Sequence, residues 1–256
     1  MAGEPRDVRG KLYHVNLGKG DVGRIALLPG DPDRVPDIAR RFKRARTLSS
    51  HREYTTYGGY IGREFVVAMS TGIGGPAAAI AVEELARLGV RVILRVGTCG
   101  AISRDVKVGS VIIPDAAVRM EGTSSQYVPL GYPAAASPEV VLALRDAASA
   151  LGKPYSMGSV ASTDSFYVGQ GRKSFGGYFP SDKAALIADL DRAKVLGFEM
   201  ECATLYTLSR VFGLKAGAVL AVVANRVTDE FKPGAGIEAA IDVAVEAVGR
   251  FKKYGV

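Results

Sequence analysis

Short apolar runs alternate with helical patterns along most of the chain. Runs of strand length, rich in β-branched residues, occupy residues 24–28, 65–69, 92–96, 111–113, 159–162 and 216–223. Helical patterns occupy residues 33–42, 76–88, 138–151, 203–212 and 237–253. Continuous apolar strands that alternate with helices indicate a mainly parallel sheet buried on both faces. We therefore predict an α/β fold, in which helices cover both faces of a mixed, mainly parallel central sheet (an α/β/α sandwich).

The pattern runs without an internal repeat or a linker, so residues 1–256 are predicted to form a single domain. With 48% hydrophobic residues, the chain can bury a sizeable core. No apolar run approaches the roughly 18 residues that a membrane-spanning helix needs. Residues 1–16, MAGEPRDVRGKLYHVN, are polar where a signal peptide would be apolar. We therefore expect a cytoplasmic protein that does not associate with membranes.

The formal net charge of +7 would suit nucleic acid or a small anion such as phosphate. The basic residues are spread along the chain, and the run RRFKR at 40–44 is interpreted as the solvated end of a helix. With two histidines and no ligand spacing around Cys99 and Cys202, we expect no metal site. Both cysteines have apolar or glycine-rich neighbours and are expected to be small buried thiols.

In parallel α/β sheets, ligands bind beyond the carboxyl ends of the strands, where four clusters lie. PGDPDR at 29–34 combines Gly30, whose amide an anion can approach, with Arg34 in the first turn of a helix. A β-turn with an aspartate cap would also explain this cluster. GIGGPA at 72–77 partly imitates a dinucleotide-binding fingerprint, but Arg95 stands near the end of the next strand, where an acidic residue is needed. A tight strand-to-helix turn is the better interpretation.

The third cluster, RVGTCG at 95–100, places Arg95 in an otherwise apolar strand, where an unpaired charge would be costly. We expect Arg95 to meet an anion, with Thr98 and glycine amides as a phosphate cradle; a buried acidic residue is the structural alternative. The fourth cluster, FEMECA at 198–203, puts Glu199 and Glu201 between a strand and a helix. These carboxylates could complement the helix dipole or accept hydrogen bonds from ribose hydroxyls.

The segment STDSFYVGQGR at 162–172 offers an aromatic ring, a carboxamide and a guanidinium within seven residues, at Phe166, Gln170 and Arg172. A pyrimidine base presents a face for stacking and a carbonyl–NH–carbonyl edge. An amide supplies both a donor and an acceptor for such an edge, and arginine supplies donors in a fixed fork. A surface turn with scattered polar residues would explain the segment equally well.

Taken together, these motifs resemble those of uridine phosphorylases, within the nucleoside phosphorylase family of trimeric and hexameric enzymes. The resemblance runs from about Leu12 to the C-terminus. It includes PGDPDR, SHREYTTY, STGIGGP, LRVGT, FYVGQGR, FEME and the pair Asn225-Arg226.

The resemblance implies a role for each matching residue. Gly30, Arg34, Arg95 and Thr98 would bind phosphate, together with Arg52 from a neighbouring subunit; Glu199, Met200 and Glu201 would bind ribose, together with the neighbour's His14; and Phe166, Gln170, Arg172 and Arg226 would bind uracil. Arg95, Gln170, Arg172 and Glu201 would carry the catalysis. The sites would then be shared between subunits of a homohexamer built as a trimer of dimers.

Two departures from the family pattern matter. Ala77 stands where similar bacterial uridine phosphorylases carry a serine that helps bind potassium with the counterpart of Glu53, so we do not expect a monovalent-ion site. Val168 replaces a common proline in the uracil loop, which would loosen the loop and broaden the range of bases.

The sequence therefore predicts the reversible phosphorolysis of uridine to uracil and ribose 1-phosphate, without a metal or another cofactor. The reaction would pass through an oxocarbenium-like ribose, and donors from Gln170 and Arg172 would stabilise the departing uracil anion. A broad-specificity or purine nucleoside phosphorylase is the nearest alternative; the aspartate with which the purine branch protonates its base is missing at Asn225-Arg226. A water-using nucleosidase would leave the arginines without an anion, and a nucleic-acid-binding module is the remote alternative.

Overall fold

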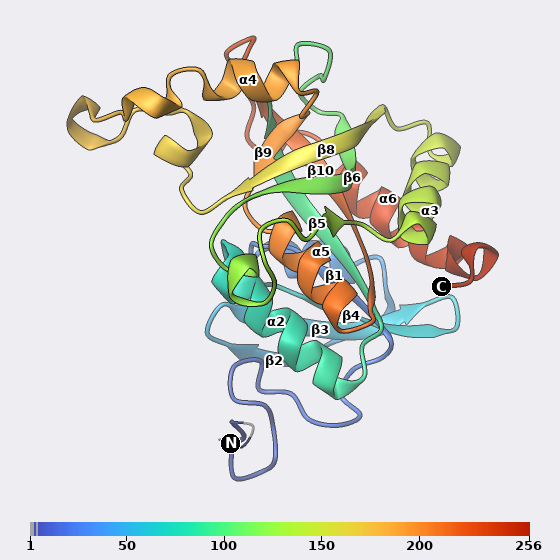
Figure 1. Cartoon of the computed structure of the whole chain (residues 1–256). Coiled ribbons are helices and arrows are strands. Elements are labelled where there is room, and N and C mark those ends of the chain that lie inside the picture. The colour runs from blue at the N-terminus through green and yellow to red at the C-terminus, as the bar shows by residue number, and fades with distance from the viewer. Residues whose placement is uncertain (1–2, 4) are drawn as a thin grey trace.

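The computed structural model describes residue 3 and residues 5–256, and it has the predicted α/β architecture (Figure 1). Its strands are β1 (Ile25–Leu28), β2 (Lys43–His51), β3 (Tyr54–Ile61), β4 (Glu64–Met69), β5 (Val92–Ala101), β6 (Val111–Met120), β7 (Ala134–Ala135), β8 (Tyr155–Thr163), β9 (Gly197–Glu199), β10 (Lys215–Asn225) and β11 (Glu230–Phe231). Its α-helices are α1 (Arg34–Ala39), α2 (Gly75–Leu88), α3 (Pro138–Ala150), α4 (Leu186–Arg192), α5 (Cys202–Val211) and α6 (Ile237–Arg250). Short 3₁₀ turns are η1 (Ser124–Gln126), η2 (Val168–Gln170), η3 (Phe175–Gly177), η4 (Ser181–Lys183) and η5 (Phe251–Tyr254).

The strands form one mixed sheet that partly closes on itself. The order of the strands is β11-β10-β6-β8-β9-β5-β1-β4-β3-β2. In addition, β10 pairs with β5. Strands β5, β10, β6, β8 and β9 therefore make a closed ring, and β1, β4, β3 and β2 extend from it. The longest pairings, β10 with β5 and β6 with β8, are parallel. The apolar pattern predicts these strands but not the closure of the ring, because closure depends on pairing between strands that are far apart in the sequence.

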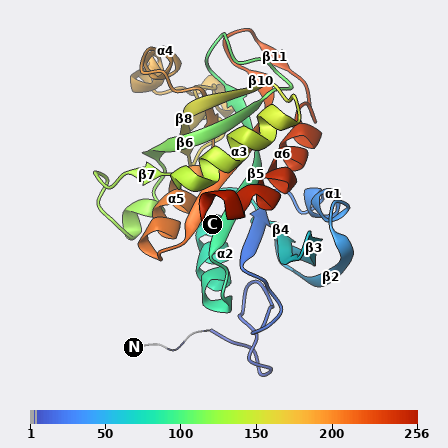
Figure 2. The same ribbon diagram turned by 90° about the vertical axis from the view of Figure 1, so that its right-hand side faces the viewer.

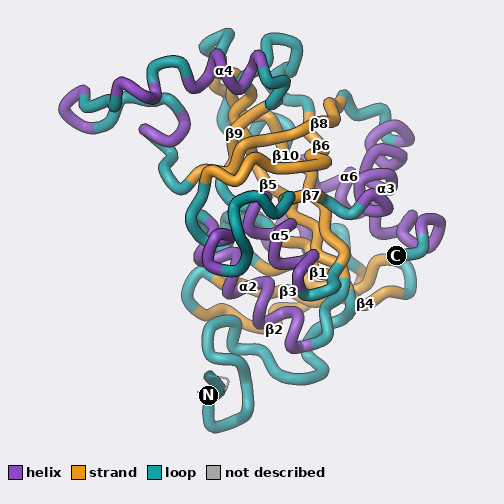
Figure 3. The backbone as a smooth tube through the Cα atoms, in the orientation of Figure 1, coloured by secondary structure: helices purple, strands orange, loops and turns teal. Residues whose placement is uncertain are grey.

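Helices cover both sides of this sheet, as Figure 2 shows in side view and Figure 3 by element type. Helix α2 packs beside α5 on one side, and α3 packs beside α6 on the other. A continuous cluster of buried aliphatic side chains fills the space between helices and strands. Among the described residues, no helix has the length and apolarity required to cross a membrane.

The predicted helix at 33–42 is too long, because α1 ends at Ala39. The basic run at 40–44 passes from the end of α1 into β2, so its interpretation as a helix end is only partly right. Strand β2 pairs with β3 as an antiparallel hairpin at the edge of the sheet. Residues 43–47 of β2 are exposed, so they lack the apolar run by which buried strands were recognised.

Strand β5 is longer than predicted and contains the whole RVGTCG cluster. It spans ten residues because β10 pairs with it from Val92 to Ala101. Gly97 is needed inside this strand, since a Cβ atom there would lie 2.9 Å from Cζ of Arg95. Arg95 and Thr98 therefore project from the middle of a strand rather than from the turn after it.

Two glycine substitutions test how closely the chain packs at the edge of β1. A Cβ atom on Gly23 would lie 1.9 Å from the carbonyl oxygen of Phe65, so Gly23→Ala must push two backbone segments apart. We expect the free energy of unfolding, measured by chemical denaturation, to fall by at least about 2 kcal/mol. Gly249→Ala is the matched control, because this residue lies in α6 with nothing within 4 Å of the added atom. There we expect a gain of about 0.5–1 kcal/mol. If the two substitutions change the free energy of unfolding equally, the backbone at Gly23 can move to accommodate the added atom.

Candidate active site

A cavity of about 570 Å³ opens where several strands end. Of the residues singled out in the sequence, it brings together Gly30, Arg34, Arg95, Thr98, Phe166, Gln170, Arg172, Glu199, Met200 and Glu201. Further lining residues include Ile73, Cys99, Phe198 and Phe231. His14, Arg52 and Arg226 do not line it. Four segments far apart in the sequence thus converge on one volume large enough for a small-molecule ligand.

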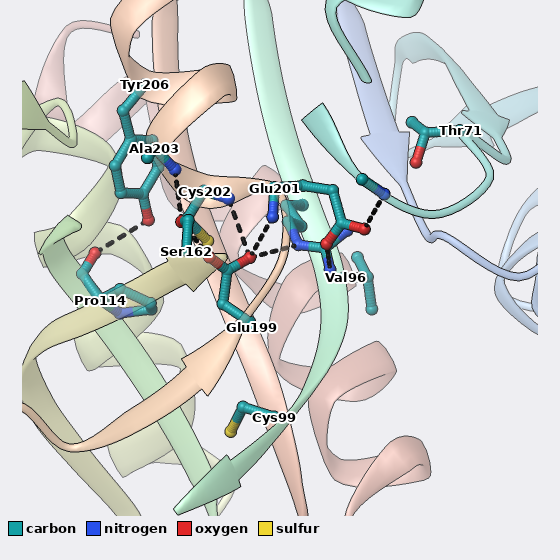
Figure 4. A network of polar contacts seen from close by, with 12 residues as sticks. Thr71, Val96, Cys99, Pro114, Ser162, Glu199, Glu201, Cys202, Ala203 and Tyr206 are labelled. Carbon is teal, nitrogen blue, oxygen red and sulfur yellow. Dashed lines mark hydrogen bonds and ion pairs between the residues drawn. The ribbon is translucent and has the colours of Figure 1, made fainter. Parts of the chain in front are cut away.

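Arg95 is buried and forms ion pairs with both glutamates of the FEME segment. Its Nη2 contacts Glu201, and its Nε lies 3.4 Å from Oε2 of Glu199 (Figure 4). Burial alone would lower the pKa of Arg95, but Glu201 and Glu199 hold it above its ordinary value. The structural alternative for Arg95 is therefore present: buried acidic partners balance its charge, so its burial by itself does not require a bound anion.

Glu199 anchors the start of helix α5. Its Oε2 accepts hydrogen bonds from the backbone amides of Glu201 and Cys202, both at 2.8 Å, and its Oε1 accepts one from Ser162 (Figure 4). Ser162 in turn accepts a hydrogen bond from the amide of Ala203 at 2.8 Å. These amides at the start of the helix have no partner within the helix itself, so a carboxylate there is stabilising. Both oxygens of Glu199 are thus engaged by the protein, although the residue lines the cavity.

Glu201 connects Arg95 to the glycine turn that follows β4. Its Oε1 accepts a hydrogen bond from the amide of Gly74 at 2.7 Å, while its Oε2 contacts Arg95. Burial raises the pKa of Glu201; Arg95 opposes this shift, and Glu199 adds to it. Gly74 adopts φ 93°, a conformation that favours glycine, and it precedes helix α2. The GIGGPA cluster is therefore the tight strand-to-helix turn predicted, and one of its amides orients a carboxylate of the site.

Arg34 lies at the same end of the cavity with weak partners. Its side chain is only 11% exposed, yet its contacts with the carbonyl of Val96 and with Asp31 are 3.5 and 3.9 Å long. Such distances are at or beyond the limit for a good hydrogen bond. Burial lowers the pKa of Arg34; Asp31 opposes this shift, and the like charge of Arg95 adds to it. A buried, poorly paired guanidinium beside a second one favours an anion in the cavity.

Arg172, which also lines the cavity, binds two of the three other predicted base contacts. Its Nη1 donates to Oε1 of Gln170 at 2.9 Å and to the carbonyl of Phe166 at 2.8 Å, and its guanidinium lies 4.2 Å above the Phe166 ring. Burial lowers the pKa of Arg172 to about 10, with a further contribution from Arg226. The Gln170 amide also donates to Thr163 at 3.3 Å, and because arginine can only donate, the amide oxygen is the end that faces Arg172.

Arg226 stands behind this loop rather than in the cavity. Its Nη1 donates to the backbone carbonyl of Gln170 at 2.8 Å, and its own amide donates to the carbonyl of Ala101 at 2.8 Å. Burial lowers the pKa of Arg226. Arg226 thus ties residues 166–172, here called the base loop, to the end of β5, a role that the sequence does not indicate.

The sequence reasoning assigned no role to Ser162, Thr163 or Gly74. Ser162 and Thr163 end β8, and a strand end with hydroxyl side chains is the signal that could have identified them. Gly74 carried only the signal of a turn. Both cysteines are free and buried, as predicted, and burial raises the pKa of each thiol. Among residues 3 and 5–256, no group of three or more histidine, cysteine or acidic side chains is placed to hold a metal ion.

The fold and the cavity define an α/β protein whose site combines an arginine pair (the cationic end), a carboxylate at Glu201 and an aromatic–amide–guanidinium set (the base end). The family model of the phosphorylase superfamily matches residues 24–254. The chain belongs to this superfamily.

Several characterised relatives match nearly the whole chain. It is 53% identical to a uridine phosphorylase of Thermococcus kodakarensis, over 96% of this chain and 89% of the relative. It is 42% identical to a uridine phosphorylase of Haemophilus influenzae, over 93% and 95% of the two chains. It is also 37% identical to a guanosine phosphorylase of Halorubrum lacusprofundi, over 87% of each chain.

The charge balance around Arg95 predicts a pH-dependent loss of stability in Arg95→Ala. A carboxyl whose pKa is raised on folding stabilises the fold fully at low pH, and this contribution is lost as the pH rises through the folded-state pKa. Removing Arg95 raises the pKa of Glu201 further, since Arg95 is the group that lowers it. Unfolding by denaturant should show a loss of about 3–5 kcal/mol near pH 8, and a clearly smaller loss below about pH 5.

The double variant Arg95→Ala/Glu201→Gln is the control, because it lacks the carboxyl that titrates. Its free energy of unfolding should vary less with pH than that of Arg95→Ala. A penalty in Arg95→Ala that is the same at both pH values would contradict the coupling between these two side chains.

Proposed function

We propose that the protein is a uridine phosphorylase, a pentosyltransferase that converts uridine and phosphate to uracil and ribose 1-phosphate in a reversible reaction. The observation that carries the proposal is the set of side chains that line one cavity. Arg95, which is buried, and Arg34, whose side chain is 11% exposed, line the same cavity as Phe166, Gln170 and Arg172. Relatives at 53% and 42% identity that are named uridine phosphorylases support the same choice.

The phosphate would occupy the cationic end. Arg34 has the weakest partners there, so it gains most from a bound oxyanion. Thr98 and the amide at Gly30 face the same cavity and could donate further hydrogen bonds. A Cβ atom at Gly30 would lie 3.1 Å from the carbonyl of Gly72, so the glycine lets these two turns approach closely.

The ribose would lie over Met200, with Glu201 accepting hydrogen bonds from its hydroxyls. Each oxygen of Glu201 has one hydrogen-bond partner, Gly74 or Arg95. In Glu199, Oε2 accepts from two amides at the start of α5, and Oε1 accepts from Ser162. We therefore propose that Glu199 acts on the ribose through the position of helix α5 and Glu201.

The reaction breaks the bond between ribose C1′ and uracil N1, and a phosphate oxygen forms the new bond to C1′. The electron pair of the broken bond leaves with the base as the uracil anion, which takes up a proton. Gln170 can donate through its amide, and Arg172 can offset the growing charge, because both are held in place before the substrate arrives. Bound phosphate offsets the positive charge that develops on the ribose. We propose that these steps need no metal or other cofactor.

We further propose that the active unit is a homohexamer, a trimer of dimers in which each cavity receives His14 and Arg52 from a neighbouring subunit. Both residues lie outside the cavity of their own chain, as such a shared site would require. A cytoplasmic location and the lack of a potassium site at Glu53 and Ala77 stay predictions.

A purine nucleoside phosphorylase is the second candidate, and the guanosine phosphorylase at 37% identity is the observation that favours it. The phosphate and ribose assignments would be the same for either base. The base end distinguishes them, because Gln170 with Arg172 fits the carbonyl–NH–carbonyl edge of uracil.

The first test is uracil release from uridine with and without phosphate, beside inosine and guanosine under the same conditions. We expect release from uridine only when phosphate is present, and slower cleavage of both purine nucleosides. Faster cleavage of guanosine or inosine would overturn the base assignment and leave the phosphate end intact. Release without phosphate would overturn phosphorolysis itself.

Replacing Arg34 with alanine tests the phosphate end. We expect KM for phosphate to rise about tenfold or more, because a charged hydrogen bond to the anion is lost. KM for uridine should change little. Arg40→Ala is the matched control, since Arg40 lies just after the same helix, is exposed and pairs with Asp37. An unchanged KM for phosphate in Arg34→Ala would place the anion elsewhere.

A further inference from the structure

His14 is held by a buried carboxylate, Glu84, that no sequence motif singles out. Its Nδ1 lies 2.7 Å from Oε1 of Glu84. The backbone amides of His14 and Val15 donate to the two oxygens of Glu84 at 3.4 and 2.9 Å. Glu84 lies inside helix α2 and is only 4% exposed. A buried carboxylate in helix α2 thus fixes both the backbone and the ring of a residue in the N-terminal segment.

This contact sets the proton arrangement of the imidazole. An ionised carboxylate can only accept hydrogen bonds, so the proton between the two groups must be on Nδ1 of His14. In the neutral ring, Nε2 is then a hydrogen-bond acceptor. The side chain of His14 is 27% exposed, so it is accessible to a donor from outside the chain.

A second set of contacts joins His14 to Arg52. Nδ1 of His51 lies 2.9 Å from the carbonyl of His14, and Arg52 donates to the hydroxyl of Tyr13 at 3.2 Å. The Tyr13 ring meets the His14 ring edge-on, with 5.0 Å between their centroids. Arg52 adopts φ 53° in the two-residue loop between β2 and β3, a left-handed conformation that costs energy for arginine. An acceptor at His14 and a cation at Arg52 therefore form one surface, which would suit a ligand with a hydroxyl group and an anionic partner.

We propose that Glu84 is a positioning residue for nucleoside recognition, which holds the Nδ1-protonated form of His14 so that Nε2 accepts a hydrogen bond from the ribose 5′-hydroxyl. This inference rests on the proposed function, in which His14 reaches the cavity of a neighbouring copy. Glu84 itself touches no substrate. Its contribution is the direction and the tautomer of the imidazole, in the way that second partners of catalytic histidines fix their rings.

The variant Glu84→Gln keeps the size of the side chain but leaves a single acceptor oxygen for three donors. We expect kcat/KM for uridine to fall about five- to tenfold, the value of roughly one hydrogen bond. For 5′-deoxyuridine, which has no 5′-hydroxyl, kcat/KM should change less than twofold. His14→Ala should likewise lower kcat/KM more for uridine than for 5′-deoxyuridine. The double variant should lose no more of its kcat/KM for uridine than His14→Ala alone. Glu83→Gln is the matched control, since Glu83 is the next residue on the helix and pairs with Arg87 and Tyr127.

A second readout does not depend on activity. Long-range ¹H–¹⁵N spectra distinguish the two imidazole tautomers, and the chain has only two histidines, so His51→Gln assigns the signals. The proposal predicts the Nδ1–H form for His14, with a larger share of the Nε2–H form in Glu84→Gln. If Glu84→Gln unfolds at the assay temperature, Glu84→Asp replaces it with the same readouts, because it keeps the carboxylate but shortens its reach.

Equal losses for uridine and 5′-deoxyuridine in a folded variant would overturn the proposal and reduce Glu84 to a structural role. An unchanged tautomer would overturn it as well. Absence of uridine cleavage by the unmodified protein would instead contradict the proposed function, and the spectra would still decide whether Glu84 sets the tautomer.

Discussion

The buried ion pairs of Arg95 with Glu199 and Glu201 are the constraint on which the candidate site depends. They join strand β5, the start of helix α5 and, through Gly74, the turn before helix α2. Removing three charged groups from water is expensive, and well-packed apolar side chains of similar size often give equal or greater stability. Stability alone therefore does not explain why this position holds an arginine and two glutamates. The proposed function would explain it, because its site must bind an anion and hydroxyl groups in the same small volume.

Glu199 and Glu201 make different contacts because helix α5 begins directly after Glu201. Glu199 precedes the first turn and accepts hydrogen bonds from two of its amides, so it cannot move without uncapping α5. Glu201 stands at the N-cap and makes its contacts outward, to Gly74 and Arg95. Only Glu201 is thus placed to share its oxygens with a ligand while the helix stays intact. In the proposed function, the spacing of two residues between these carboxylates would separate a structural role for Glu199 from a binding role for Glu201.

The sequence predicted which segments come together better than it predicted the contacts between them. The buried strands and the long helices were predictable because burial leaves continuous apolar runs or helical periodicity, as in 92–96 and 76–88. The hairpin of β2 and β3 was not, since the edge strand is largely exposed and Arg52 at its tip has no apolar signal. Arg95 was correctly recognised as unusual. Its carboxylate partners lie more than a hundred positions further along the chain, so no local sequence pattern can reveal the contact. The role of Arg226 behind the base loop was hidden for the same reason, because it acts through a backbone carbonyl that any residue would supply.

The base loop shows how a shared scaffold can serve different nucleosides. Residues of the cationic end and Glu201 would meet phosphate and ribose, which uridine phosphorolysis and guanosine phosphorolysis have in common. Discrimination must therefore come from Gln170, Arg172 and the groups that fix them. Thr163 and Arg172 contact the two ends of the Gln170 side-chain amide, and Arg226 donates to the backbone carbonyl of Gln170. An amide that cannot turn over presents one donor–acceptor pattern, and a base with the opposite pattern leaves buried polar groups unpaired. Selectivity for the base would thus depend on the hydroxyl of Thr163 and on Arg226 as much as on the side chains that touch the base.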